Sequence, residues 1–167
     1  MYFLLVGLAL AADPVSQDRF GTPDVVAEAT LQIDPTMVTE RLSDLAWWSE
    51  HAPDSCYGAW SLGASVRGPE ARARVTVRPS WMRRRLTVVV REVRPGALVD
   101  LEFLGPKGFT TRVKLEPEEQ DHVVMTTFMN PAPWPLREIY HQKVKPAWMA
   151  CQQGVLHAVM SSSEASD

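Results

Sequence analysis

The chain has 167 residues, of which 46% are hydrophobic and 22% are charged, and its formal net charge is -3. This composition fits one globular domain with a sizeable core and excludes a disordered chain. Nucleic-acid-binding domains are usually basic, so we expect no nucleic acid as a partner.

The first twelve residues are apolar, and Asp13-Pro14 ends this run. The run is too short for a transmembrane helix, which needs about 20 apolar residues. With the small residues Ala9 and Ala11 it predicts a secretory signal peptide over residues 1–11, although a basic n-region is missing. We therefore expect an exported protein, in the bacterial periplasm or outside the cell. A buried N-terminal segment in a cytoplasmic protein is the alternative.

Alternation of apolar and polar residues predicts a series of strands after a polar leader at residues 12–23. Each run has the period of two that is typical of half-buried strands. Turn signals such as Pro95-Gly96 separate the runs, and this arrangement predicts an antiparallel meander. The expected strands fall at about residues 24–33, 57–66, 71–78, 84–94, 97–103, 109–115 and 122–129.

Helical signals follow the first strand and recur at the end of the chain. Asp34 is placed to cap a helix that has Pro35 at its first position, and a second short helix or turn carries Trp47 and Trp48. Apolar residues at intervals of three and four predict an amphipathic helix over residues 134–160. Pro146 predicts a kink or break near residues 142–146. Residues 163–167 are expected to form a disordered tail.

Four short segments carry a resemblance to a known family. They are Ile33-Asp34-Pro35 before the first helices, residues 81–86 (Trp-Met-Arg-Arg-Arg-Leu), residues 93–96 (Val-Arg-Pro-Gly), and Thr126-Thr127 before the last helix. In this order, over roughly residues 24–162, the chain resembles the START-like or SRPBCC superfamily, which includes polyketide cyclase/dehydrase-like and lipid-transfer proteins. The resemblance implies an α+β helix-grip fold. In this fold a curved antiparallel sheet of about seven strands, with two short helices after the first strand, wraps around a long C-terminal helix.

The resemblance also implies a cavity between sheet and helix that holds a hydrophobic small molecule such as a lipid or polyketide. Large aromatic side chains suit the walls of such a pocket, although they also fill ordinary cores. The superfamily has no universal catalytic residue, so it transfers no active site. We predict that the ligand contacts Trp48, Tyr57, Trp60, Val75, Val77, Trp81, Val99, Leu101, Phe103, Thr111, Val113, Met125, Phe128, Tyr140 and Trp148.

Three functions are consistent with this pattern. The first is a non-catalytic carrier of an apolar ligand, with transient membrane contact left open. The second is a cyclase/dehydratase-type enzyme that uses polar cavity groups, and the third is an interaction module without a ligand. No G-x-S-x-G, H-E-x-x-H or phosphate-binding loop is present. The unranked candidates for a catalytic group are Glu40, Tyr57, Thr111, Thr126 and Tyr140.

The two cysteines, Cys56 and Cys151, leave two interpretations open. They could pair in an oxidising compartment, or both could be buried free thiols, because sequence does not show whether their Cα atoms come within reach. No Cys-x-x-Cys or Cys/His spacing is present, and no metal or other cofactor is predicted.

Arginines alternate with apolar residues along the strand at 71–78. We expect Arg72, Arg74 and Arg78 on the solvent face, paired across strands with Asp100, Glu102 or Glu92. The basic turn at residues 83–85 is the remaining candidate for an anion contact.

Overall fold

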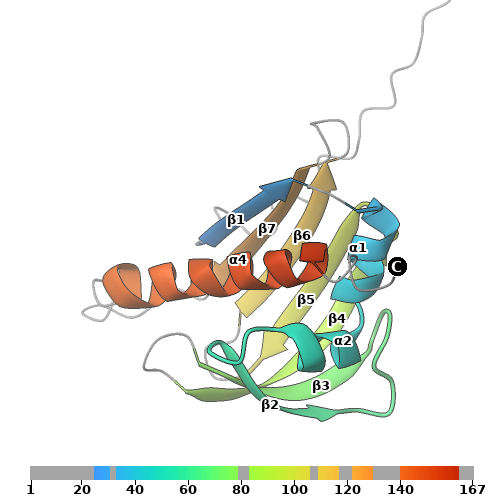
Figure 1. Cartoon of the computed structure of the whole chain (residues 1–167). Coiled ribbons are helices and arrows are strands. Elements are labelled where there is room, and N and C mark those ends of the chain that lie inside the picture. The colour runs from blue at the N-terminus through green and yellow to red at the C-terminus, as the bar shows by residue number, and fades with distance from the viewer. Residues whose placement is uncertain are drawn as a thin grey trace, which may run out of the picture.

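The computed structural model describes residues 25–30, 33–78, 83–105, 109–116, 122–129 and 140–161. The predicted signal peptide, leader and tail lie outside these residues. The described strands form one antiparallel sheet in the order β1-β7-β6-β5-β4-β3-β2, as Figure 1 shows. Their bounds are β1 Val25–Thr30, β2 Tyr57–Leu62, β3 Arg72–Val77, β4 Arg84–Arg94, β5 Leu98–Leu104, β6 Phe109–Glu116 and β7 His122–Met129.

Two short helices, α1 (Pro35–Leu42) and α2 (Leu45–His51), follow β1. The Asp34 carboxylate accepts a hydrogen bond from the Thr36 amide at 2.6 Å, so the predicted cap of α1 is confirmed. This bond lowers the pKa of Asp34. Asp44 caps α2 in the same way and also pairs with Arg67 at 2.6 Å. Both helices therefore begin at a side chain that satisfies free backbone N–H groups.

The last helix, α4, runs over Lys145–Ser161 and follows a π-helical turn at Tyr140–Val144. Pro146 lies in the first turn of α4, where a missing N–H leaves no helical hydrogen bond unmade. The expected interruption is therefore the change of helix type between Val144 and Lys145, and the proline does not bend the body of α4.

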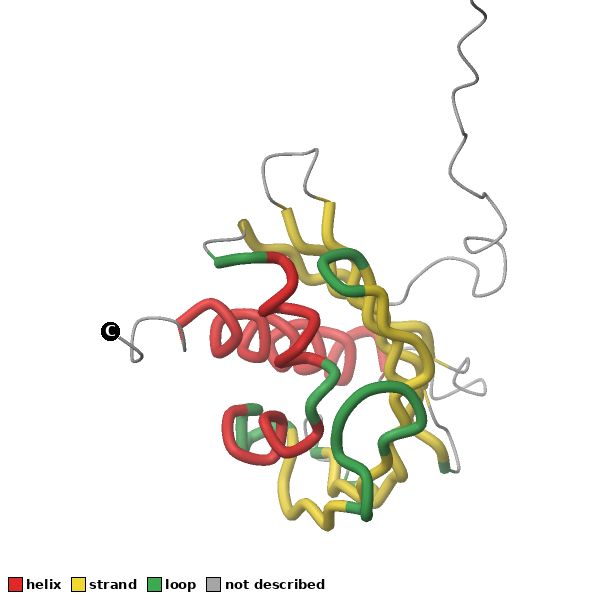
Figure 2. Tube along the Cα trace, turned by 90° about the vertical axis from the view of Figure 1, so that its right-hand side faces the viewer, coloured by secondary structure: helices red, strands yellow, loops and turns green. Residues whose placement is uncertain are grey.

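The helices lie on one side of the curved sheet, and α4 crosses its concave face (Figures 1 and 2). Arg41 of α1 donates a hydrogen bond to the carbonyl of Val159 at 2.6 Å, which places a positive charge at the C-terminal end of α4. The Gly96 amide donates to the Thr39 hydroxyl at 3.0 Å, and Gly96 has the left-handed backbone angle φ 69°. These bonds join α1 to both α4 and the β4–β5 turn.

Ion pairs on the outer face differ from those predicted for Arg72, Arg74 and Arg78. Because β4 separates β3 from β5, these arginines do not reach the acidic residues of β5. Within the described part of the chain, Arg72 pairs with Glu70 at 3.1 Å, whereas Arg74 and Arg78 form no ion pair. The acidic residues take other partners: Asp100 with Arg112 at 2.7 Å, Glu102 with Arg91 at 2.5 Å, and Glu92 with Arg94 at 2.6 Å.

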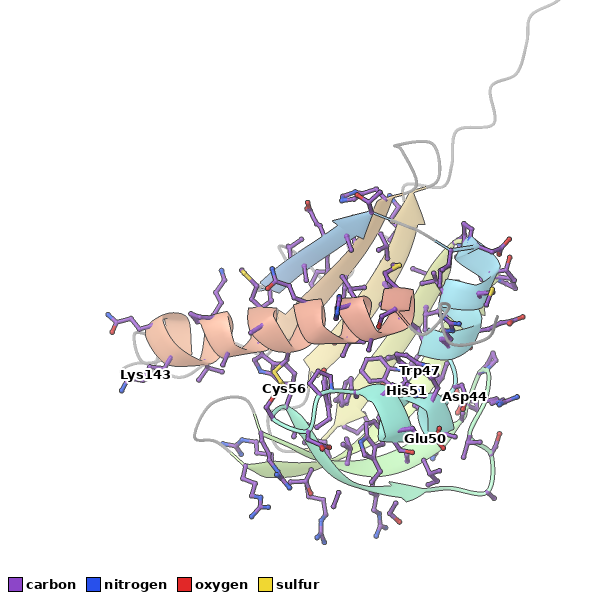
Figure 3. All side chains as sticks on the ribbon, in the orientation of Figure 1. Asp44, Trp47, Glu50, His51, Cys56 and Lys143 are labelled. Carbon is purple, nitrogen blue, oxygen red and sulfur yellow. A yellow bond between two sulfur atoms is a disulfide. The ribbon has the colours of Figure 1, made fainter. Side chains whose placement is uncertain are left out.

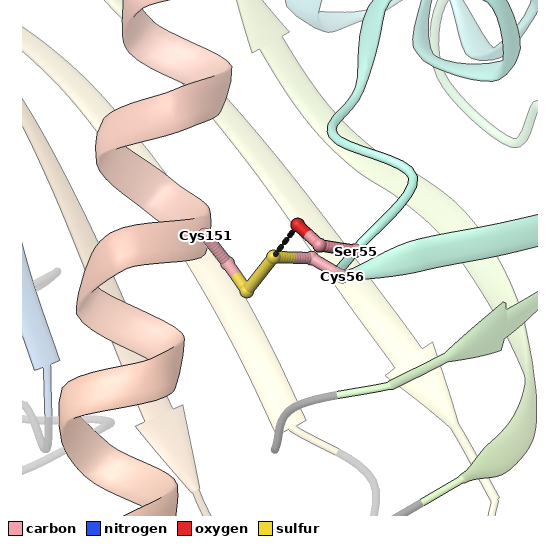
Figure 4. The surroundings of a disulfide bond; sticks show 3 residues. All are labelled: Ser55, Cys56 and Cys151. Atoms are coloured by element: carbon pink, nitrogen blue, oxygen red, sulfur yellow. Dashed lines mark hydrogen bonds between the residues drawn. A yellow bond between two sulfur atoms is a disulfide. The ribbon is translucent and has the colours of Figure 1, made fainter.

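Cys56 and Cys151 form a disulfide, with their Cα atoms 5.7 Å apart (Figure 4). Of the two interpretations that the sequence left open, a disulfide or two free thiols, the structure has the disulfide. Cys56 directly precedes β2, and it lies beside α4 in Figure 3. The disulfide thus connects the last helix to the edge strand that lies farthest from β1 in the sheet.

Replacing both cysteines with alanine should lower the free energy of unfolding by about 2–4 kcal/mol, because the bond restricts the unfolded chain. Urea unfolding followed by tryptophan fluorescence measures this change. Ser55→Ala, beside the disulfide, is the control and should shift the free energy by no more than about 0.5 kcal/mol. Rapid alkylation of both cysteines in native, unreduced protein would contradict the pairing.

Candidate ligand-binding site between the helix and the sheet

An aromatic cluster centred on Tyr57 occupies the space between the helices and the sheet. The ring centroid of Tyr57 lies 5.5 Å from that of Trp48 and 6.0 Å from that of Trp148. Trp60 and Phe103 each lie 6.3 Å from Tyr57. These rings come from α2, α4, β2 and β5, so one cluster connects the elements that enclose the interior. Edge-on and tilted contacts at these separations are favourable for aromatic pairs.

A β-bulge places both Tyr57 and Trp60 on the inner side of the sheet. Residues three apart in a regular strand point to opposite faces. Here Tyr57 pairs with Val77 and Trp60 pairs with Val75, so Gly58 and Ala59 together face the single residue between these partners. The extra residue changes the alternation of β2, which is the usual effect of a bulge.

Tyr57 is a polar residue in an apolar setting. Its side chain is almost fully buried, with 2% of its surface exposed. Its hydroxyl forms no hydrogen bond within the described residues, and burial raises its pKa above the usual value. The phenol therefore stays protonated at neutral pH and can donate a hydrogen bond.

Three further polar side chains, Thr111, Thr127 and Gln152, lie where α4 faces β6 and β7. Thr111 and Thr127 are partners in the β6–β7 register, and their hydroxyl oxygens lie 3.1 Å apart. The side-chain amide of Gln152 donates to the Thr127 hydroxyl. The other end of that amide, Oε1, is buried and has no partner within the described residues. Because a flipped amide would leave the nitrogen unpaired instead, Gln152 keeps one unmet hydrogen bond in either orientation.

Most of the residues predicted to contact a ligand lie in this interior. Trp60 is partly buried against the core, while Trp81 and the Tyr140 side chain lie outside the described part of the chain. Phe128 alternates with Thr127 and so lies on the outer face of β7. The buried members are Trp48, Tyr57, Val75, Val77, Val99, Leu101, Phe103, Thr111, Val113, Met125 and Trp148.

Two of the candidate catalytic groups lie away from the interior. Glu40 is exposed on α1, and Thr126 donates to the Arg112 carbonyl on the outer side of the sheet. Sequence reasoning had instead missed Thr127 and Gln152. Gln152 could have been found, because it lies four residues after Trp148 and four before Leu156 on the apolar stripe of α4.

Across the described residues, no three His, Cys, Asp or Glu side chains gather closely enough to hold a metal ion. The described helices are also not long and apolar enough to cross a membrane.

Comparison with known proteins finds similarity in structure but not in sequence: no family model and no curated protein matches. The matches with three solved structures extend over almost the whole length of those chains. The Zhui aromatase/cyclase from Streptomyces sp. R1128 has a TM-score of 0.64 at 13% identity, over 84% of this chain and 92% of that one. TTHA0849 from Thermus thermophilus has a TM-score of 0.68 at 14% identity, over 86% and 99%. Ara h 8.0201 has a TM-score of 0.56 at 15% identity, over 84% and 96%.

These similarities, with the strand order and the long last helix, define the chain as a helix-grip protein. It has the fold of the START-like or SRPBCC superfamily, as the order of its elements predicted. At such low identities the similarity shows the fold and transfers no particular residue.

Tyr57 should not ionise near pH 10 in the folded protein, unlike an exposed tyrosine. Because its folded-state pKa is raised, the stability from the buried neutral phenol is fully present below the unfolded-state pKa of about 10. This stability is lost as the pH rises through the folded-state pKa. Alkaline titration by tyrosinate absorbance should show a late component that Tyr57→Phe removes. Titration of all tyrosines near pH 10 before unfolding would contradict the burial.

Proposed function

We propose that the protein binds an apolar small molecule with at least one hydrogen-bonding group in the space between α4 and the concave face of the sheet. The observation that carries this proposal is the unpaired amide end of Gln152, buried beside Thr111 and Thr127. Within the described residues, no group donates a hydrogen bond to the Oε1 atom of this amide.

The energetic argument starts from the cost of burying that amide. An unsatisfied buried polar group destabilises a fold by about 1–3 kcal/mol, and a leucine of similar size would avoid the cost. A hydroxyl or carbonyl on a bound ligand would offset it. The Tyr57 phenol, whose side chain is almost fully buried, supplies a donor from β2.

The lining indicates what the rest of the ligand is like. Trp148 lies one helical turn from Gln152 and contacts Tyr57, so aromatic rings lie next to both polar groups. Rings favour flat, apolar partners. A lipid, a polyketide or another aromatic metabolite belongs to this class. The similarity in fold to an aromatase/cyclase and to Ara h 8.0201 supports the proposal at the level of the superfamily.

The disulfide supports an exported location, because disulfides form and persist in oxidising compartments. A carrier outside the cytoplasm would collect or release an apolar ligand by transient contact with a membrane. A cyclase/dehydratase is the second function that the fold supports, since one of its structural neighbours is an aromatase/cyclase.

Native mass spectrometry of the protein purified from its source tests binding directly. A co-purifying apolar molecule, released unchanged, supports the carrier. Conversion of that molecule on incubation would indicate the enzyme instead. Protein that is always empty and binds no apolar probe would indicate a module without a ligand.

Gln152→Leu should weaken binding of 2-naphthol about tenfold while leaving binding of 2-methylnaphthalene unchanged, because only the naphthol offers a hydrogen bond to the amide. Fluorescence titration measures both affinities. The free energy of unfolding should change by less than about 1 kcal/mol, since Leu removes the hydrogen bond to Thr127 and the unpaired amide together. An equal loss for both probes would contradict the role of the amide.

A further inference from the structure

A hollow lies on the surface, where α2 and the following loop meet the start of β2. It is open to solvent and has a volume of about 510 Å³, which is within the range of sites for small molecules. It is lined by Ser49, Asp54, Gly58, Ala59, Trp60 and Arg78. We propose that this groove is a binding site for an aromatic carboxylate, with the carboxylate on Arg78 and the ring against Trp60.

The guanidinium of Arg78 is held in the groove by its surroundings. The Arg78 amide donates to the Cys56 carbonyl at 2.7 Å, which fixes the backbone beside the disulfide. The guanidinium lies directly over Gly58: a Cβ atom added at Gly58 would come within 2.6 Å of Arg78 Nε. The bulge at Gly58 and Ala59 therefore creates the space that the arginine occupies.

Within the described residues, the guanidinium of Arg78 has no anionic partner. Its Nε is shielded from solvent without a hydrogen-bond partner, and Arg78 forms no ion pair among the residues that the structure describes. A shielded guanidinium nitrogen without an acceptor is unfavourable, and a carboxylate can satisfy two of its N–H groups at once. Ser49 does not compete for this anion as a donor, because its hydroxyl already donates to the Ala46 carbonyl at 2.8 Å.

The other wall residues define the rest of the ligand. Trp60 is half-buried and lines the groove, so an aromatic ring can pack on it. Asp54 also lines the groove but is not paired with Arg78 in the described structure. Its negative charge repels a bound carboxylate and selects against ligands that carry further anionic groups. A flat monocarboxylate fits this combination of one cation, one indole and one carboxylate.

The proposal for this groove does not depend on the proposal for the interior, because it rests on Arg78 and the β2 bulge and not on Gln152. Binding of 2-naphthoate, followed by shifts of the Trp60 indole N–H resonance, tests it, and 2-naphthylmethanol is the uncharged control. Arg78→Gln should weaken naphthoate binding about tenfold or more and leave the alcohol unaffected. Gly58→Ala keeps the charge but displaces the guanidinium, so it should weaken naphthoate binding as well.

Matched variants separate this site from general electrostatics and from the interior. Arg74→Gln removes the same charge from the exposed face of β3 and should leave the naphthoate affinity unchanged. Asp54→Asn should strengthen it, and Gln152→Leu should not change it. If Arg74→Gln and Arg78→Gln weaken binding equally, or if Asp54→Asn abolishes it, the proposed site is wrong. Naphthoate binding that responds only to Gln152→Leu would place that ligand in the interior and would likewise overturn the proposal.

Discussion

A seven-stranded sheet that curves around one helix has two edges, and α4 is held at both of them. At one edge α4 packs alongside β1, and at the other the disulfide joins Cys151 to Cys56 at the start of β2. Burial of apolar surface gives the first attachment, and a covalent bond gives the second. Because the helix cannot move away from either edge without breaking one of these two attachments, the distance between the helix and the sheet is fixed. The aromatic cluster around Tyr57 lies between them.

Local chemistry in the sequence was enough to predict the elements and their order. Asp34-Pro35 began a helix, alternation gave the strands, and Pro95-Gly96 gave a turn, because each depends on residues within a few positions. The interior was predicted as far as alternation holds, which is why Tyr57 and Phe103 were found. Phe128 was placed on the wrong side because strand residues 122–129 are apolar on both faces, so composition does not decide which set faces α4. The cysteine pairing and the unmet hydrogen bond of Gln152 could not be predicted from the sequence, because both depend on distances between elements that are far apart in the chain.

Trp60 belongs to both regions that we consider functional. Its ring contacts Tyr57 on the inner side, and the same residue lines the surface groove beside Arg78. The interior and the groove therefore share a wall made of one indole. A ligand that moved this ring on one side would change the packing available on the other, which is a direct physical route for coupling between two sites. The disulfide at Cys56 lies close in sequence to this wall and limits how far the backbone can follow.

The bulge in β2 also has a consequence for how related chains could diverge. Loss of one residue at Gly58 or Ala59 would remove the bulge, and Tyr57 and Trp60 would then lie two positions apart in a regular strand and stay together on the inner face. The interior would keep both rings, whereas the space over Gly58 that the Arg78 guanidinium occupies would change. The length of this short segment thus decides the shape of the groove, while both rings remain in the interior.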